Sequence, residues 1–311
     1  MKMKWLCLFT TLMILCLVCS MAVAEEIALP MGSMDEIGIP MPENAAMTLP
    51  IDFSAGQPLQ PSGFKEHWVY EDPTISVRVD MGRVDDCDWW RADIRIADPS
   101  QLRTISAGGF DTSKVMQGTQ LAKRVNAVLA IDGDYYWYTG KGYIVRQGVE
   151  YLNILDGKRD VLLIDDWGDF HVIKNARAED VSMVIGRRKV VNAFFFGPAL
   201  VMDGQEQSVS GNIDMVPDEK RQRMAICQVG DLHYMAICCA PPARGSKGMT
   251  LQRFARLCAE QGVQTAYNMD GGDSTMLIFN GEKLNDITSN STREISDIIY
   301  FASAYVPEES K

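Results

Sequence analysis

The stretch GMTLQRFARLCAEQGVQTAYNMDGGDST, residues 248–275, carries signals for a helix, a strand and a turn in succession. Thr250 can cap the start of the helix, and Gly262 provides a left-handed stop after it. Four apolar residues recur at helical spacing on one face: Leu251, Phe254, Ala255 and Cys258. The apolar run 263–269 then predicts a buried strand that ends at an acidic, glycine-rich turn.

Short apolar runs of this kind recur along the chain and predict a sheet-rich core. The runs are 75–79, 92–96, 127–131, 161–164, 171–173, 200–202, 224–229, 234–238 and 298–302. Asp-Gly or Asn-Gly pairs at 156–157, 203–204 and 280–281 favour hairpins. A second, shorter helix is expected from residue 111 or 118 to about 123. The expected fold is α+β: a mixed, sheet-rich single domain with a few helices packed on the sheet.

The N-terminus has the layout of a secretory signal peptide. Lys2 and Lys4 precede an apolar run at 5–18, which ends in Ala22-Val23-Ala24 before Glu25. We expect residues 1–24 to be a signal peptide, 25–67 an irregular leader or strap, 68–306 a catalytic domain and 307–311 a tail. These boundaries predict a secreted or extracytoplasmic protein of the cell envelope, with no stable membrane insertion after cleavage.

The charge balance narrows the class of partner. The chain has 30 Lys and Arg against 41 Asp and Glu, a formal net charge of −11. Such a surface repels polyanions at long range, so nucleic acid is excluded as an expected partner. An anionic polymer would have to be held by locally concentrated basic side chains.

The later of two acidic turns, Asp270-Gly271-Gly272-Asp273-Ser274 (the second turn), is one candidate site. Two glycines at a strand end permit positive φ and let a ligand approach the main chain. Asp and Gly are also common turn residues, so one such turn alone is better explained as an acidic surface turn.

An earlier turn of the same kind, at 132–134 (the first turn), changes that interpretation. The strand at 127–131 runs into Asp132-Gly133-Asp134, which is followed by four aromatic residues, Tyr135, Tyr136, Trp137 and Tyr138. Aromatic faces stack on sugar rings, and carboxylates bind sugar hydroxyls. The alternative is a solvated turn beside core aromatics, but four consecutive aromatics cannot all be buried in a strand with one solvated face.

Two arginines could complete a site for a phosphate. Arg223 opens the strand at 224–229, and Arg293 lies before the last strand. A guanidinium fork suits a phosphate or carboxylate, although either arginine taken alone is better interpreted as structural.

The motifs resemble those of the phosphodiester glycosidase family. Residues 126–136, NAVLAIDGDYY, are similar to its INGDYY motif, and residues 196–204, FGPALVMDG, to its FGPxLVxxG stretch. Residues 223–226, RMAI, resemble its RTAIG strand, and GMTL at 248–251 with NMDGGDS at 268–274 resembles its GMTL…NLDGGGS region. The resemblance continues through Asn280-Gly281, Asn285, Arg293 and Ile295-Ser296-Asp297 and covers residues 68–306.

Two positions depart from the family pattern. Asp132 replaces the usual Asn, which we expect to add a charge, and Asp273 replaces a Gly in a loop about one residue shorter. Either change could alter substrate choice or damage activity.

The resemblance implies cleavage of a sugar 1-phosphodiester, with an N-acetylglucosamine-like sugar, at the anomeric carbon. We assign Asp270 to the carboxylate role, with Asp132 or Asp134 as its partner or as a ligand of sugar hydroxyls. Arg223 and Arg293 are expected to clamp the phosphate. The other expected substrate-binding residues are Gly133, Tyr135, Tyr136, Asn268, Gly271, Gly272, Asp273 and Ser274.

Two other functions remain open. A metal-dependent phosphodiesterase would gather Asp132, Asp134, Asp270 and Asp273 around Mg²⁺ or Ca²⁺, whereas the glycosidase is expected to need no cofactor. A non-catalytic envelope protein would bind a glycan without cleaving it. The enzyme hypothesis depends on the turns at 132–134 and 270–274 meeting in space.

Overall fold

The computed structural model describes residues 54–110, 113–136, 140–186, 188–209, 215–286 and 292–307. The expected signal peptide, leader residues 25–53 and tail residues 308–311 lie outside these ranges. No helix within them is long and apolar enough to cross a membrane. The last part of the leader is hydrogen-bonded to the domain, since the N–H of Gly56 donates to the carbonyl of Val125 and that of Gln57 to Ser303.

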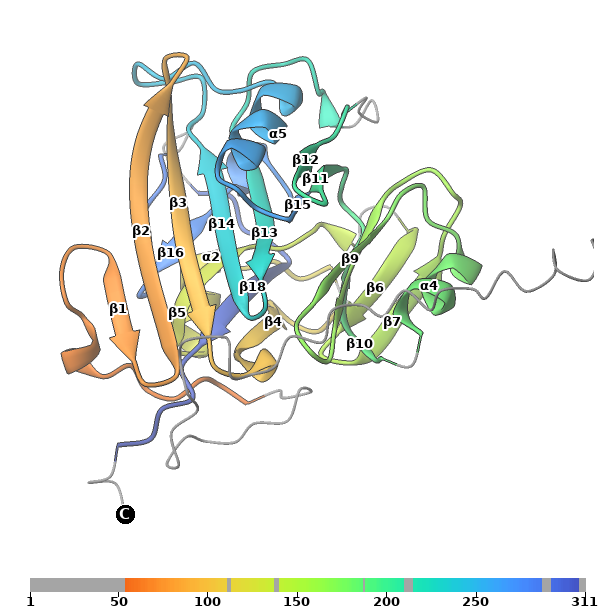
Figure 1. Cartoon of the computed structure of the whole chain (residues 1–311). Helices are drawn as coiled ribbons and strands as arrows, with labels where there is room; N and C mark the ends of the chain where they lie inside the picture. Colours follow the sequence, from red (N-terminus) through yellow and green to blue (C-terminus); the bar gives the residue numbers. More distant parts are fainter. Residues whose placement is uncertain are drawn as a thin grey trace, which may run out of the picture. The chain divides into compact units, whose positions relative to one another are not determined.

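The largest of three sheets has eight strands in the order β1-β2-β3-β14-β13-β15-β11-β12 (Figure 1). They are β1 (Val69–Asp72), β2 (Ile75–Val84), β3 (Cys87–Ile96), β11 (Ala199–Met202), β12 (Gln205–Glu206), β13 (Met224–Gly230), β14 (His233–Cys239) and β15 (Thr265–Asn268). Side chains of β13 alternate between two cores, with Ile226 in the main core and Ala225 and Cys227 in the core beneath helix α5 (Leu251–Glu260).

The second sheet carries the first candidate turn. Its order is β17-β16-β5-β18-β4, with β4 (Leu102–Ser106), β5 (Ala127–Asp132), β16 (Leu277–Phe279), β17 (Glu282–Lys283) and β18 (Asp297–Ala302). All six residues of β5 are buried, because one side packs in the main core and the other against helix α2 (Gly118–Arg124). Burial on both faces fixes the end of β5, where Asp132 lies.

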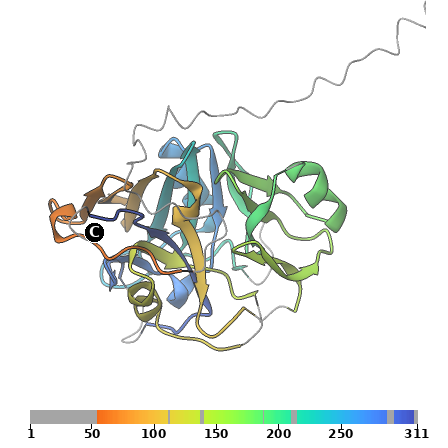
Figure 2. The same ribbon diagram turned by 90° about the horizontal axis from the view of Figure 1, so that it is seen from below.

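The third sheet is formed by a segment between β5 and β11 in the sequence. Its order is β7-β6-β10-β8-β9, with β6 (Gly142–Arg146), β7 (Val149–Ile154), β8 (Val161–Asp165), β9 (Phe170–Ile173) and β10 (Val190–Phe194). Helix α4 (Ala178–Ile185) contacts β9. Its strands group together in both views, apart from the long strands β2 and β3 (Figure 2).

These elements confirm the expected α+β class. Each strand predicted from an apolar run is present, and every pair of described strands is antiparallel. In α5 the hydroxyl of Thr250 accepts from the N–H of Arg253 at 3.3 Å, and Gly262 has φ of 77°.

The hairpin predictions are partly wrong. The turns at 203–204 and 280–281 do join paired strands, β11 with β12 and β16 with β17. The turn at 156–157 does not, because β6 and β10 lie between β7 and β8 in the sheet.

Candidate active site

The two predicted turns meet. The main-chain N–H of Asp270 donates to the carbonyl of Gly133 at 3.4 Å. The N–H of Met276, just beyond the second turn, donates to Oδ1 of Asp132 at 2.7 Å. Both turns follow buried strands, β5 and β15, so their positions are set by the core. The condition on which the enzyme hypothesis depends is therefore met.

Gly133 is required by a close approach from β18. Its N–H donates to the carbonyl of Asp297 at 3.1 Å. A Cβ at this position would lie 2.2 Å from Oδ1 of Asp297, a distance that real Cβ atoms do not show. The missing side chain lets the carboxylate of Asp297 lie directly against the turn.

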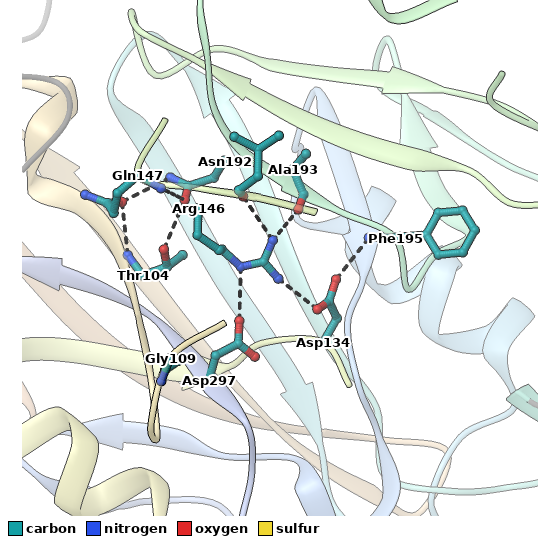
Figure 3. Close-up of polar contacts among 11 residues, drawn as sticks. Thr104, Gly109, Asp134, Arg146, Gln147, Asn192, Ala193, Phe195 and Asp297 are labelled. Carbon is teal, nitrogen blue, oxygen red and sulfur yellow. Dashed lines mark hydrogen bonds and ion pairs between the residues drawn. The ribbon is translucent and has the colours of Figure 1, made fainter. Parts of the chain in front are cut away.

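A buried ion network lies behind the first turn (Figure 3). Arg146 of β6 donates from Nη2 to Oδ1 of Asp134 at 2.8 Å and from Nε to Oδ2 of Asp297 at 3.1 Å. Its Nη1 also donates to the carbonyls of Val145 and Ala193. Asp134 Oδ2 accepts the N–H of Phe195 at 3.0 Å. Both oxygens of Asp134 are thus occupied, which supports a positioning role.

Electrostatics couple the members of this network. Burial would lower the pKa of Arg146, but the facing carboxylates of Asp134 and Asp297 outweigh it and raise that pKa. Burial raises the pKa of Asp297 to about 7, with repulsion from Asp134 adding to it and Arg146 opposing it. The guanidinium therefore stays charged and holds two acidic side chains inside the protein.

The expected aromatic platform is divided. Tyr136 is buried, with the Arg146 guanidinium 5.6 Å from its ring centre and the ring of Phe110 at the same distance. Tyr135 is partly exposed, with its ring edge-to-face with Phe196 at 5.1 Å. Tyr135 can meet a ligand, whereas Tyr136 supports the turn from within; Trp137 and Tyr138 lie outside the described residues.

Asp270 is a partly buried residue just beyond the end of β15. Oδ1 accepts the N–H of Gly271 at 2.8 Å. Burial raises the pKa of Asp270 to about 6, and repulsion from Asp134 adds to the increase. Hydrogen bonds from the Ser274 hydroxyl and the Gly271 N–H, together with the charge of Arg293, oppose it. A carboxyl of this pKa changes its charge close to neutrality, as a general base does.

Ser274 and Asp273 connect Asp270 to Arg293. Nη1 of Arg293 donates to the Ser274 hydroxyl at 3.4 Å, and Nη2 lies 3.7 Å from Oδ2 of Asp273. The Arg293 side chain is still more than half exposed, so it can bind an anion in the cleft.

Asp132 is fully buried and changes our expectation about charge. Burial, followed by repulsion from Asp270, raises the pKa of Asp132 well above its usual value. Oδ1 accepts from Met276, and Oδ2 has no hydrogen-bond partner. The raised pKa favours the neutral acid over the added charge that the sequence predicted. The neutral acid offers one acceptor and one hydroxyl donor, much like the Asn of the family pattern.

The glycines of the second turn do not offer free main-chain donors. The N–H of Gly271 bonds to Asp270, and that of Gly272 to the carbonyl of Gln222 at 3.1 Å. Gly272 has φ of 60°, and a Cβ there would meet no atom within 4 Å. Gly272, one of the two glycines, therefore leaves open space beside the Asp270 carboxylate, as expected.

Arg223 is not placed to clamp a phosphate. It is buried, and its guanidinium donates to the carbonyls of Met215, Val216 and Glu219 at 2.9 to 3.0 Å. Burial lowers the pKa of Arg223. Its guanidinium is committed to the loop before β13. Both arginines of the predicted pair line the smaller hollow, but only Arg293 also lines the larger one.

Asn268 keeps an acceptor available near the second turn. Nδ2 donates to the carbonyl of Gly197 at 2.8 Å, while its buried Oδ1 has no hydrogen-bond partner. Oδ1 is therefore suited to accept a bond from a bound ligand.

Two hollows of about 970 and 520 Å³ form one cleft, since Tyr135, Asp270 and Arg293 line both. The first also has basic residues that the sequence did not single out: Lys141, Lys158 and Arg159. Arg146 was missed as well, although a charged residue at the end of an apolar run, Tyr143-Ile144-Val145, is itself a sign of a buried partner.

The four acidic residues of the metal hypothesis do not form a ligand set. Asp134 has both oxygens bound within the protein, and Asp273 faces Arg293. Within the part of the chain that the structure describes, no group of three or more His, Cys, Asp or Glu is arranged to hold a metal ion.

Comparison with known proteins identifies the family. The model of the phosphodiester glycosidase family matches residues 125–302, more than half of the chain. The chain belongs to the phosphodiester glycosidase family. Its Asp132 and Asp270 turns both lie inside the matched segment.

Individual relatives are more distant. The SPbeta prophage-derived uncharacterized protein YomE of Bacillus subtilis (strain 168) is 26% identical over 197 residues, which are 61% of this chain and 30% of that protein. The chain thus matches less than a third of the length of this relative. The zebrafish N-acetylglucosamine-1-phosphodiester alpha-N-acetylglucosaminidase catalytic domain, auto-inhibited by its pro-peptide, has a TM-score of 0.61 at 17% identity, covering 85% of this chain and all of that one.

A hypothetical protein from Synechocystis has a TM-score of 0.53 at 13% identity, covering 73% of this chain and 62% of that chain. At these identities the two solved structures show a shared fold.

Proposed function

We propose that the protein is an exported hydrolase that cleaves sugar 1-phosphodiesters at the anomeric carbon, with an N-acetylglucosamine-like sugar. The observation that carries the proposal is that Tyr135, Asp270 and Arg293 all line both hollows of the cleft. Family membership, and the activity for which the zebrafish relative is named, support the class of substrate.

Each of the three residues suits one part of such a substrate. The partly exposed ring of Tyr135 can stack on the apolar face of a sugar. The guanidinium of Arg293 can hold the phosphate. Asp270 then faces the anomeric carbon between them, with the open space beside Gly272 next to it.

The reaction needs little help for the leaving group. A bond forms between a water oxygen and C1, the bond between C1 and the phosphate oxygen breaks, and the electron pair leaves with a phosphate monoester. Ionised Asp270 either accepts the proton of that water or attacks C1 first and is displaced by water. Arg293 stabilises the charge that develops on the departing phosphate.

An isotope experiment tests the bond that breaks. The phosphodiester of N-acetylglucosamine 1-phosphate with methanol is incubated with the purified protein in H₂¹⁸O, and the methyl phosphate is analysed by mass spectrometry. Cleavage at C1 yields methyl phosphate without ¹⁸O. Label in the phosphate would instead identify a phosphodiesterase, and glycan binding without any product would identify a non-catalytic protein.

Export rests on the N-terminal sequence, with Lys2 and Lys4 before an apolar run. A mature protein that begins at Glu25 in the extracytoplasmic fraction supports this part of the proposal. An intact N-terminus in the cytosolic fraction would contradict it.

A further inference from the structure

The cleft has two arms, and Asp270 belongs to the lining of both. Asp270 lies where two hollows of about 970 and 520 Å³ share their lining. Sites for one small ligand occupy roughly 300–1,000 Å³, so the first hollow alone reaches the upper end of that range. The second hollow adds space that one sugar phosphodiester does not need.

The larger arm has its own cations. Lys141, Lys158 and Arg159 line it and are absent from the lining of the smaller arm. Lys141 is engaged by Asp156 at 3.2 Å, and the guanidinium of Arg159 lies over the ring of Phe195 at 5.6 Å. The exposed ammonium group of Lys158 forms no ion pair with a described residue.

The smaller arm repeats this arrangement. Lys220 and Arg221 line it and do not line the larger arm. Arg221 pairs with Glu219 at 2.6 Å, whereas the exposed Lys220 has no ion-pair partner among the described residues. Lys158 and Lys220 therefore leave one unpaired cation in each arm, and Arg293, which is more than half exposed beside Asp273, lines both arms.

A protein with a net charge of −11 repels polyanions at long range. The cleft can offset that repulsion at particular points, because two of its acidic residues, Asp156 and Glu219, are already paired with Lys141 and Arg221. A linear chain with a phosphate at every repeat fits this distribution of cations, because one phosphate can meet Arg293 while its neighbours meet Lys158 and Lys220. A sugar with a single phosphate would leave both arms unused.

We infer that the substrate is a sugar-phosphate polymer and that the enzyme cleaves it internally, with one arm of the cleft on each side of the scissile bond. This inference rests on the proposed function and specifies its substrate class. In each event water adds to C1 of one repeat and the neighbouring phosphate leaves as a monoester on the other fragment.

The probe is a synthetic hexamer of N-acetylglucosamine units joined from C1 to C6 by phosphodiesters, with a fluorophore at one end. Internal cleavage gives labelled fragments of intermediate length among the first products. A ladder in which the chain loses one terminal unit at a time overturns the inference. Hydrolysis of the methyl phosphodiester of N-acetylglucosamine 1-phosphate in that same case shows that the proposed function still holds.

Variants test the two arms separately. Lys158→Ala and Lys220→Ala are each expected to raise the KM for the hexamer, relative to that for the methyl phosphodiester, by roughly three- to tenfold. The control is Lys174→Ala, because Lys174 is exposed and lines neither hollow; it should change neither KM. If the ratio of the KM for the hexamer to the KM for the methyl phosphodiester stays at the wild-type value in both variants, the arms do not bind the polymer and the inference is overturned.

Discussion

The main-chain N–H of Asp270 donates to the carbonyl oxygen of Gly133 at 3.4 Å. This bond ties the turn after β15, in the eight-stranded sheet, to the turn after β5, in the sheet that also contains β18. Gly133 in turn bonds to Asp297, and Asp297 is held by Arg146. The position of the Asp270 carboxylate therefore depends on the buried network around Arg146.

Activity should rise with pH through about 6. Asp270 acts in its ionised form, and its pKa is raised to about 6, mainly by burial. We expect kcat/KM to increase tenfold per pH unit below 6 and to level off above it. Asp270→Asn should abolish turnover at every pH while the circular dichroism spectrum stays native. An unchanged pH profile in that variant would remove Asp270 from the mechanism.

Asp270 should also lower the free energy of unfolding at neutral pH. A carboxyl whose folded pKa is raised binds its proton more tightly in the folded state, so the folded state loses stability as pH rises from about 4 to about 6 and gains none back above it. Asp270→Asn should therefore be more stable than the wild type at pH 7, by about 1–3 kcal/mol, and equal to it near pH 3. Urea unfolding at the two pH values measures the difference.

Asp86 supplies the control for that experiment. Asp86 is exposed, and its hydrogen bond to Lys247 shifts its pKa in the opposite direction, downward. Asp86→Asn should give no gain at pH 7. A gain of equal size in both variants would show that loss of net negative charge, rather than burial of Asp270, is responsible.

The sequence predicted the meeting of the two turns because each follows a buried strand and each carries a family motif. Arg223 was misplaced because the carbonyls that bind it lie on residues 215–219, a loop with no periodic pattern. Arg146 was missed because Asp297 lies 151 positions away from it. Local sequence patterns thus predicted the strands and turns. Side-chain partners that meet only when the three sheets pack together could not be predicted without the fold.

Asp132→Asn should preserve both fold and activity. The neutral acid and the amide each offer an acceptor for the N–H of Met276, and the raised pKa favours the neutral form of Asp132. We expect kcat/KM within about tenfold of the wild type. Asp132→Ala removes that acceptor and leaves a buried N–H unpaired, which should cost about 1–3 kcal/mol in urea unfolding. A loss of activity in Asp132→Asn as complete as in Asp270→Asn would show that Asp132 must ionise or donate a proton during turnover.

Arg146→Met should destabilise the protein strongly. It removes the shared partner of Asp134 and Asp297 and leaves two buried carboxyls without their cation. The free energy of unfolding should fall by about 3–5 kcal/mol. Arg78→Met is the matched control, because the pair of Arg78 with Glu66 is exposed on both sides and should change stability by less than about 1 kcal/mol. Equal losses in the two variants would mean that the buried network adds nothing beyond a surface pair.

Gly133→Ala should damage activity and stability together. The new methyl group would lie 2.2 Å from Oδ1 of Asp297, and this carboxylate cannot swing away because Arg146 holds its other oxygen at 3.1 Å. The turn must move instead, and the bond from Asp270 to Gly133 moves with it. We expect a loss of about 2 kcal/mol or more in urea unfolding and at least a tenfold lower kcat. Gly230→Ala is the control, since a methyl group there meets no atom within 4 Å and should change stability by less than about 0.5 kcal/mol. Wild-type kcat in Gly133→Ala would show that the Asp270 carboxylate is positioned independently of the first turn.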